Sequence, residues 1–165
     1  MLAAILLATA TTLGTATALG AATTLAPVLG AGAPWANASG PPPTAHRVTI
    51  VDVFTFDCIN CKHVTPELRK LRAAYAPAEL AILGVHAPEL PQEHVHANVV
   101  QALRDQDIAW PVLYDDDFRI WNAYGVNAWP TQLVFDKRGK LRATYVGEGY
   151  DAQLERTVRG LVGEK

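Results

Sequence analysis

The chain has 165 residues, half of them hydrophobic, which is enough for one packed domain and a short extra segment. Its formal net charge at pH 7 is only −2. Because neither sign of charge dominates, the composition gives no reason to expect a nucleic-acid partner.

The first 38 residues differ from the rest in composition. All 14 basic and 16 acidic side chains lie at or after Arg47. Residues 1–38 are rich in Ala, Thr and Leu and end in Ala36-Asn37-Ala38, which has the small-x-small form of a signal-peptidase site. One interpretation is an export signal cleaved after Ala38. The other is a retained membrane anchor, because roughly twenty apolar residues can cross a bilayer.

Both interpretations predict an extracytoplasmic location, in the periplasm or cell envelope, with the domain secreted or anchored to a membrane. In a plain signal peptide a basic residue precedes the apolar run, and none precedes it here. The chain could therefore also be the tail of a longer membrane protein. Residues 39–46 begin with Ser-Gly-Pro-Pro-Pro and are expected to form an extended linker. Residues 47–165 are expected to form the soluble domain.

The predicted elements of this domain alternate between strands and helices. Residues 47–54 are β-branched and apolar and predict a buried strand, and a helix follows from near Cys58 to Pro77. The remaining predicted elements are a strand over 80–86, an amphipathic helix over 93–107 with Val95, Val99, Ala102 and Leu103 on one side, a strand over 111–114, a short helix over 115–124 capped by aspartates, strands over 131–135 and 141–146 joined by a hairpin turn, and a helix over 150–162. This order predicts an α/β fold with a mixed central sheet and helices on both faces.

Cys58-Ile59-Asn60-Cys61 contains the only two cysteines of the chain. The pair stands where a buried strand gives way to a helix, and a helix N-terminus offers free N–H groups and partial positive charge. Such a site favours a thiolate, so Cys58 is predicted to be the exposed nucleophile. Cys61, one turn further into the helix, would attack the resulting mixed disulfide.

Two other interpretations of this pair are possible. A structural disulfide constrains little chain when its cysteines are three residues apart. A zinc site needs four ligands, and no second CxxC or regular histidine spacing supplies them. We therefore expect redox chemistry, with no metal and no organic cofactor beyond the redox-active disulfide.

The segment from Val51 to Leu68, VDVFTFDCINCKHVTPEL, resembles the active-site segment of thioredoxin-like proteins. Further similarity lies in GVHAPEL, in WNAYGVNAWPT and in Gly147-Glu148-Gly149. Together these features resemble the TlpA/ResA branch of the family, most closely the thioredoxin-like domain of DipZ-type membrane proteins. The resemblance implies a thioredoxin-like three-layer sandwich with a TlpA-type helix–strand insertion, here residues 93–114.

The resemblance also implies site residues. Asp52, six residues before Cys58, matches the buried carboxylate expected to take or return the Cys61 proton. Pro130 matches the cis-proline beside the disulfide, and Trp129 before it would pair with substrate backbone. Ile59 and Asn60 are expected to contact substrate. His86 and Glu89 match family positions near the site, with no role assigned.

Asp57 departs from the family pattern, in which an uncharged residue commonly precedes the first cysteine. A carboxylate beside a thiolate opposes its ionisation, and less thiolate stabilisation gives a more reducing couple. We therefore expect an extracytoplasmic thiol–disulfide oxidoreductase that reduces protein disulfides. The domain is expected to be monomeric, to act on protein disulfide or thiol substrates, and to take electrons from a membrane thiol carrier of CcdA/DipZ type.

Two alternative functions remain from the sequence. One is a copper-binding chaperone of thioredoxin fold, since two cysteines and a distant histidine can hold Cu(I). The other is a thiol peroxidase related to the peroxiredoxins. Its PxxxTxxC pattern is incomplete here, because Thr55 stands three residues before Cys58 but residue 51 is Val rather than Pro.

Overall fold

The computed structural model describes residues 21–164, and the predicted leader falls outside it up to residue 20. Six strands form one mixed sheet in the order β1-β4-β3-β2-β5-β6. They are β1 (Trp35–Ala36), β2 (Val48–Phe54), β3 (Leu80–His86), β4 (Val112–Tyr114), β5 (Thr131–Phe135) and β6 (Leu141–Val146). Strands β2, β3 and β4 are parallel to one another, whereas β1, β5 and β6 pair antiparallel with their neighbours.

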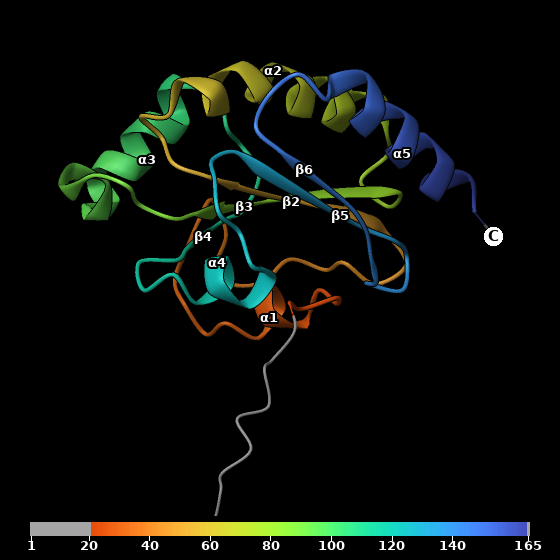
Figure 1. Cartoon of the computed structure of the whole chain (residues 1–165), viewed down its shortest axis with the longest axis horizontal. Coiled ribbons are helices and arrows are strands. Elements are labelled where there is room, and N and C mark those ends of the chain that lie inside the picture. The colour runs from red at the N-terminus through yellow and green to blue at the C-terminus, as the bar shows by residue number, and fades with distance from the viewer. Residues whose placement is uncertain (1–20, 165) are drawn as a thin grey trace, which may run out of the picture.

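Helices cover both faces of this sheet, as the sequence predicted (Figure 1). The helices α2 (Ile59–Ala74), α3 (His96–Asp105) and α5 (Asp151–Gly163) lie on one face, and α1 (Ala26–Leu29) and α4 (Arg119–Tyr124) lie on the other. Side chains alternate along β2, so Ile50 and Phe54 pack under α2 while Val51 and Val53 pack towards α4. The result is the predicted three-layer arrangement of the thioredoxin-like fold.

The predicted helix over 93–107 is wrong in its first turn. Residues Pro91–His94 form a 3₁₀ turn, and α3 begins only at His96. Val95, which we expected on the apolar side, adopts an extended conformation and is 49% exposed. The break allows Glu93 to turn inward, where its buried carboxylate accepts backbone hydrogen bonds from a neighbouring loop.

The turns near the sheet agree with their expected chemistry. Asp136 accepts hydrogen bonds from the backbone N–H groups of Arg138 and Lys140, and Gly139 has a φ of +73°, which closes the hairpin between β5 and β6.

Asp115 accepts from the N–H groups of Ile120 and Trp121 in the first turn of α4. Of the three aspartates expected to cap that helix, Asp115 makes both of these bonds.

Residues 22–37 form a segment that we call the N-terminal strap. Near one edge of the sheet, Thr24 bridges Lys140, which precedes β6. On the opposite edge, β1 pairs with β4. Between them Leu25 and Val28, which are 4% and 0% exposed, fill the core on the α4 face. The strap thus contributes to the same core as residues 47–164, although the sequence placed it in the leader.

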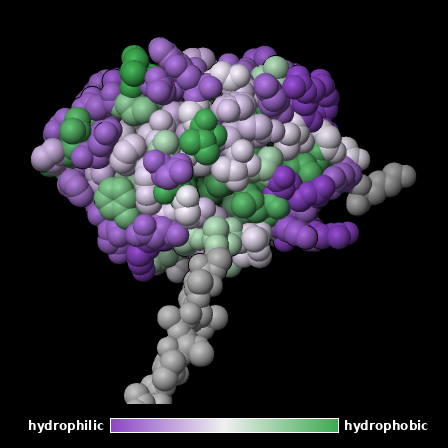
Figure 2. All heavy atoms as spheres, in the orientation of Figure 1, coloured by the Kyte–Doolittle hydropathy of each residue, from purple (hydrophilic) through white to green (hydrophobic). Residues whose placement is uncertain are grey.

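Hydrophobic side chains reach the surface only in scattered groups between hydrophilic ones in the view of Figure 2. No helix among residues 21–164 is both long enough and apolar enough to cross a bilayer.

Candidate active site

Cys58 and Cys61 lie at the start of α2 and are joined in a disulfide. Cys58 is the N-cap residue of the helix, and its Sγ accepts a 3.2 Å hydrogen bond from the N–H of Cys61. Cys58 is half-buried, whereas Cys61 is only 4% exposed. Once the pair is reduced, this N–H and the helix dipole stabilise a thiolate at Cys58. Cys58 is therefore placed to attack, and Cys61 is protected.

The dipeptide between the cysteines faces outward. Ile59 is 62% exposed and Asn60 is half-buried. Neither side chain is charged, so neither alters the charge near Cys58. An exposed apolar residue beside a reactive thiol suits contact with a substrate backbone or side chain, which keeps both residues as candidates for substrate binding.

Asp52 is buried in the middle of β2, on the sheet face that α2 covers. The alternation along the strand places it on the side of Ile50 and Phe54, which share a core cluster with Cys61. Burial raises the pKa of Asp52 to about 7, although a hydrogen bond from Gln132 opposes the rise. A carboxyl group that titrates near neutral pH can both accept and return a proton. This is the behaviour expected of the base that serves Cys61.

Three loops meet near Cys58, at the end of the sheet where β2 and β3 finish and β5 begins. β2 runs towards Cys58, β3 ends beside it at His86, and antiparallel β5 begins at Thr131 opposite Val53. The loop before β5 contains the Trp129–Pro130 peptide bond, which is cis. The topology thus places the cis-proline loop and the loop after β3 at the same end of the sheet as the cysteine pair.

Trp129 joins two of these loops. Its Nε1 donates a 3.0 Å hydrogen bond to the carbonyl of Ala87, and its ring lies against Trp121 with centroids 4.4 Å apart. The ring is half-buried, so one side remains accessible. Trp129 can therefore form an apolar wall beside the disulfide, and its substrate contact stays a prediction.

Glu93 was not recognised from the sequence as part of the site. Its side chain is fully buried, and its Oε2 accepts from the N–H groups of Glu89 and Leu90 at 2.6 and 2.7 Å. Its Oε1 accepts from the N–H of Asp57, the residue before Cys58, at 3.1 Å. Burial raises the pKa of Glu93, but the hydrogen bonds from Thr55 and these three N–H groups outweigh it and hold the pKa below its usual value. Glu93 is therefore an ionised group that ties the loop after β3 to the loop before Cys58.

His86 lies against this cluster at the end of β3 and is fully buried. Burial lowers its pKa to about 4, so the ring is neutral at pH 7. Nε2 lies 3.4 Å from the hydroxyl of Thr55, which donates its own proton to Glu93. The His86 ring also stacks on Phe56, with centroids 5.7 Å apart.

The Asp57 side chain points towards solvent rather than into the site. It accepts a 3.1 Å hydrogen bond from Gln92 and lies 3.9 Å from the ammonium of Lys62. Asp57 precedes Cys58 in the sequence, and the Glu93 carboxylate accepts from the N–H of Asp57. Among residues 21–164, only the Asp57 carboxylate of these two has a cationic partner. The charges around Cys58 therefore include an ionised, buried carboxylate that the sequence did not predict.

Two signals in the sequence could have identified the residues that were missed. Gln132 is a strongly polar residue in the predicted strand over 131–135, as Asp52 is in the strand over 47–54, and two such residues in neighbouring strands commonly pair. Glu93 stands three residues after Leu90, the spacing at which a glutamate reaches back to an N-terminal backbone N–H. Within residues 21–164, no group of three or more His, Cys, Asp or Glu side chains is arranged to hold a metal ion.

Comparisons with known proteins agree with this geometry. Residues 44–144 match the AhpC/TSA family. NHL repeat-containing protein 2 of Gallus gallus is 34% identical over 133 residues, which are 78% of this chain and 18% of that protein. Protein DipZ of Mycobacterium tuberculosis is 31% identical over 144 residues, 84% of this chain and 21% of that protein. The chain thus spans about a fifth of the length of these two relatives.

A relative of similar length and a solved structure point the same way. The thiol-disulfide oxidoreductase YkuV of Bacillus subtilis is 26% identical over 118 residues, 72% of this chain and 79% of that protein. The crystal structure of the thioredoxin-like superfamily protein SPOA0173 superposes with a TM-score of 0.72 at 26% identity, covering 79% of this chain and 92% of that one. The chain belongs to the AhpC/TSA family, has the thioredoxin-like fold and carries the CxxC disulfide Cys58–Cys61.

Proposed function

We propose that this protein is an extracytoplasmic reductant of protein disulfides. The observation that carries the direction is the charge around Cys58. Glu93 is ionised and buried, and because it accepts a hydrogen bond from the N–H of Asp57, its negative charge lies against the loop that leads into Cys58. Negative charge disfavours the Cys58 thiolate relative to the disulfide, which makes the couple more reducing.

The reaction begins with the reduced pair. The Cys58 thiolate attacks one sulfur of a substrate disulfide, forming a mixed disulfide and releasing one substrate thiolate. Cys61 then loses its proton to Asp52 and attacks the Cys58 sulfur. This second step releases the other substrate sulfur, which takes up a proton, and leaves Cys58 and Cys61 joined as they are in the structure. Two electrons have passed to the substrate.

The oxidised pair must then be reduced by a second dithiol. The resemblance to DipZ-type membrane proteins supports a membrane thiol carrier of CcdA/DipZ type as that donor. The uncharged residues of the leader support a location at or beyond a membrane. Among the relatives, ResA and YkuV bear the name thiol-disulfide oxidoreductase, which supports protein thiols and disulfides as the substrates here.

The reduction potential of the full chain tests the direction. The protein is equilibrated against glutathione at several ratios, and the free thiols are read by alkylation. We expect a potential near or below roughly −250 mV, whereas a potential near roughly −120 mV would identify an oxidant. A pair that never forms a disulfide would overturn the redox assignment, and titration with Cu(I) would then test the copper-chaperone alternative.

Substrate trapping tests the attacking role independently of the potential. In the Cys61→Ser variant the mixed disulfide at Cys58 has no resolving thiol, so we expect it to accumulate with partner proteins on a non-reducing gel. The Cys58→Ser variant is the matched control and should trap nothing. Trapping by Cys58→Ser and not by Cys61→Ser would reverse the two roles.

A peroxidase function receives less support from the site. In the PxxxTxxC pattern the threonine accompanies a peroxide-reducing cysteine, and Thr55 stands at that spacing here. Its hydroxyl is fully buried and engaged with Glu93 and His86. The threonine therefore belongs to the buried group of Thr55, His86 and Glu93, which we call the loop cluster.

A further inference from the structure

A cavity of about 460 Å³ lies at the opposite end of the molecule from Cys58. The last turns of α2 and the beginning of β3 form part of its wall, at Arg72, Tyr75 and Leu80. The cysteine pair, by contrast, lies at the first turn of α2 and beside the end of β3. The thiol chemistry therefore does not account for this cavity, whose volume falls in the range typical of small-molecule sites.

Most of the cavity wall is apolar. Tyr75 and Trp110 present rings and Leu80 and Ile82 present aliphatic side chains, and four prolines complete it: Pro42, Pro43, Pro77 and Pro111. Pro42 and Pro43 belong to the segment that we expected to be an extended linker. Such a wall favours an occupant with a flat or aliphatic apolar body.

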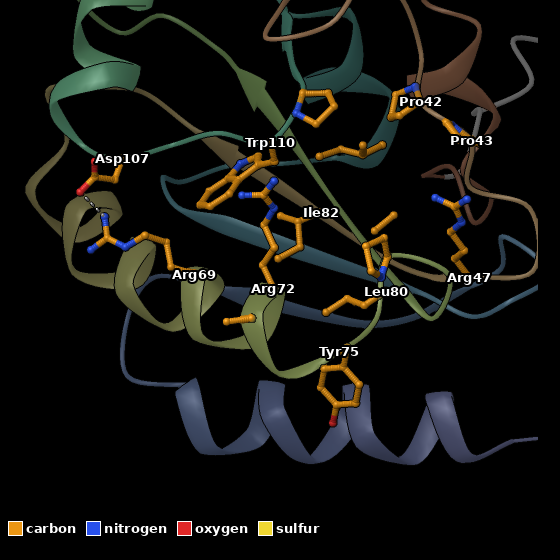
Figure 3. A pocket seen from close by; sticks show the side chains of 15 residues that line it. Pro42, Pro43, Arg47, Arg69, Arg72, Tyr75, Leu80, Ile82, Asp107 and Trp110 are labelled. Atoms are coloured by element: carbon orange, nitrogen blue, oxygen red, sulfur yellow. Dashed lines mark ion pairs between the residues drawn. The ribbon is translucent and has the colours of Figure 1, made fainter.

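The charged groups of the wall are predominantly basic. Three arginines line the cavity together with one carboxylate, Asp107. Arg69 is already engaged, because it donates to the carbonyl of Gln106 at 2.7 Å and lies 3.9 Å from Asp107. Arg47 and Arg72 make no ion pair with any residue from 21 to 164. Figure 3 shows Arg72 extending from α2 towards Trp110, with Arg47 on the far side of Leu80.

We propose that this cavity binds a small organic monocarboxylate with an aromatic or aliphatic body. A guanidinium recognises a carboxylate through two parallel N–H···O bonds, and Arg72 is available for this purpose, while Arg47 adds positive charge from the other side of Leu80. The apolar body would lie against the accessible apolar side chains of the wall, Tyr75, Pro42 and Pro77, above the buried Trp110. The cavity also adjoins the C-terminal end of α2, where the helix dipole is negative and disfavours a doubly charged phosphate more than a singly charged carboxylate. The arginines and this dipole together favour the carboxylate over the phosphate.

The test uses four probes that share a naphthalene ring and differ in the polar group attached to it. Each is titrated into the full oxidised chain by calorimetry. They are 2-naphthoate, 2-naphthylmethanol, 2-naphthylmethylammonium and 2-naphthyl phosphate, with acetate as a carboxylate that lacks the apolar body. We expect 2-naphthoate to bind most tightly. We expect the alcohol and acetate to bind at least about tenfold more weakly, because each lacks one half of the recognition. Preference for the phosphate would overturn the carboxylate assignment.

Matched variants locate the site. Arg72→Gln should weaken 2-naphthoate binding at least about tenfold, and Arg47→Gln should weaken it in the same direction. Arg104→Gln removes an exposed arginine of α3 that does not line the cavity, and it should leave the affinity unchanged. The indole N–H of Trp110 has no hydrogen-bond partner within residues 21–164, and its NMR signal should shift on binding. Equal affinities for Arg72→Gln and Arg104→Gln, or shifts confined to residues near Cys58, would refute the proposal.

The two proposals fail separately. Because the cavity is remote from the cysteines, a Cys58→Ser/Cys61→Ser double variant should bind 2-naphthoate as the parent does. An oxidising potential would refute the proposed reductant and leave this site intact. Absence of binding by all five probes at millimolar concentration would refute the site and leave the thiol chemistry intact.

Discussion

Gln132 and Asp52 face each other across β5 and β2, and the Nε2 of Gln132 donates a 2.8 Å hydrogen bond to the Oδ1 of Asp52. Both side chains are buried, and within residues 21–164 this is the one side-chain hydrogen bond that the carboxyl group accepts. Burial therefore dominates, and the pKa of Asp52 is raised to about 7. Asp52 is present in both protonation states at neutral pH, which a proton-exchanging group requires.

Replacement of Asp52 by Asn should slow resolution of the mixed disulfide. The Asn side chain retains the shape but cannot take the Cys61 proton, and general-base catalysis typically contributes on the order of 100-fold or more. Stopped-flow reduction of a disulfide-containing peptide, measured from pH 5 to 9, should show an inflection near pH 7 that the variant lacks. Asp105→Asn, an exposed site on α3, is the control. An inflection that persists unchanged in Asp52→Asn would assign it to another group.

Replacement of Gln132 by Leu should move that inflection upwards. The hydrogen bond from Gln132 favours the ionised form of Asp52, so its loss leaves burial unopposed. A hydrogen bond to a charged group contributes about 1.5 kcal/mol, which corresponds to about one pH unit. The same stopped-flow series measures it. An inflection that moves down would mean that Gln132 stabilises the protonated form.

Asp52 should also make the stability of the oxidised protein depend on pH. Its pKa is about 7 in the folded state and near 3.8 in the unfolded state, so the folded state holds more protons between these values. The free energy of unfolding should therefore fall as the pH rises from about 4 to 7. Asp52→Asn should be more stable than the parent at pH 8, by an amount on the order of 4 kcal/mol, and the difference should shrink towards pH 4. Urea denaturation at several pH values measures both curves, and parallel curves would contradict the raised pKa.

The central strands and the cysteine pair could be predicted from the sequence because their signals are local. The run Val48–Phe54 is apolar at almost every position, and a CxxC directly after such a strand is typical of a redox-active pair. Asp52 and Pro130 were found through resemblance, since nothing in their immediate neighbours marks them.

Glu93 and the N-terminal strap could not be predicted in this way because their partners are distant in sequence. The helical pattern over 93–107 is real from His96 onwards, but hydrogen bonds from residues as far away as Asp57 outweigh it at Glu93. The strap is uncharged and rich in Ala, which is also the composition of an export leader. Its strand β1 is recognisable only once β4 is present to pair with it.

Replacement of Glu93 by Gln should destabilise the loop cluster and make the cysteine couple more oxidising. Gln keeps one acceptor oxygen, so at least one of the N–H groups of Asp57, Glu89 and Leu90 loses its partner, at a cost of roughly 1–3 kcal/mol. Loss of the negative charge favours the Cys58 thiolate and should raise the reduction potential by roughly 15–30 mV.

Urea denaturation and glutathione equilibration measure the two effects separately, and Asp105→Asn, at an exposed site on α3, is the control. Thr55→Val offers a milder disturbance of the same cluster if Glu93→Gln does not fold, because it removes the contacts of the Thr55 hydroxyl with Glu93 and His86 and retains the charge of Glu93. It should lower stability with little change in potential. An unchanged potential in a folded Glu93→Gln would show that the carboxylate does not act on Cys58.

The N-terminal strap should be required for full stability, which can be tested by comparing residues 21–165 with residues 39–165. Removal of the strap exposes the core around Leu25 and Val28 and leaves the edge of β4 without β1. Full burial of each such side chain contributes about 1.5–3 kcal/mol, so we expect the shorter form to lose several kcal/mol in the free energy of unfolding.

The double variant Leu25→Ala/Val28→Ala, in the longer form, is the matched control and should account for much of the loss while β1 remains in place. If the shorter form is as stable as the longer one, cleavage after Ala38 would leave a complete domain. If it is not, we expect N-terminal sequencing of the protein recovered from its native cells to show that residues 22–37 are retained. A cleavage that removed β1 would leave the domain with an unpaired sheet edge and an open core.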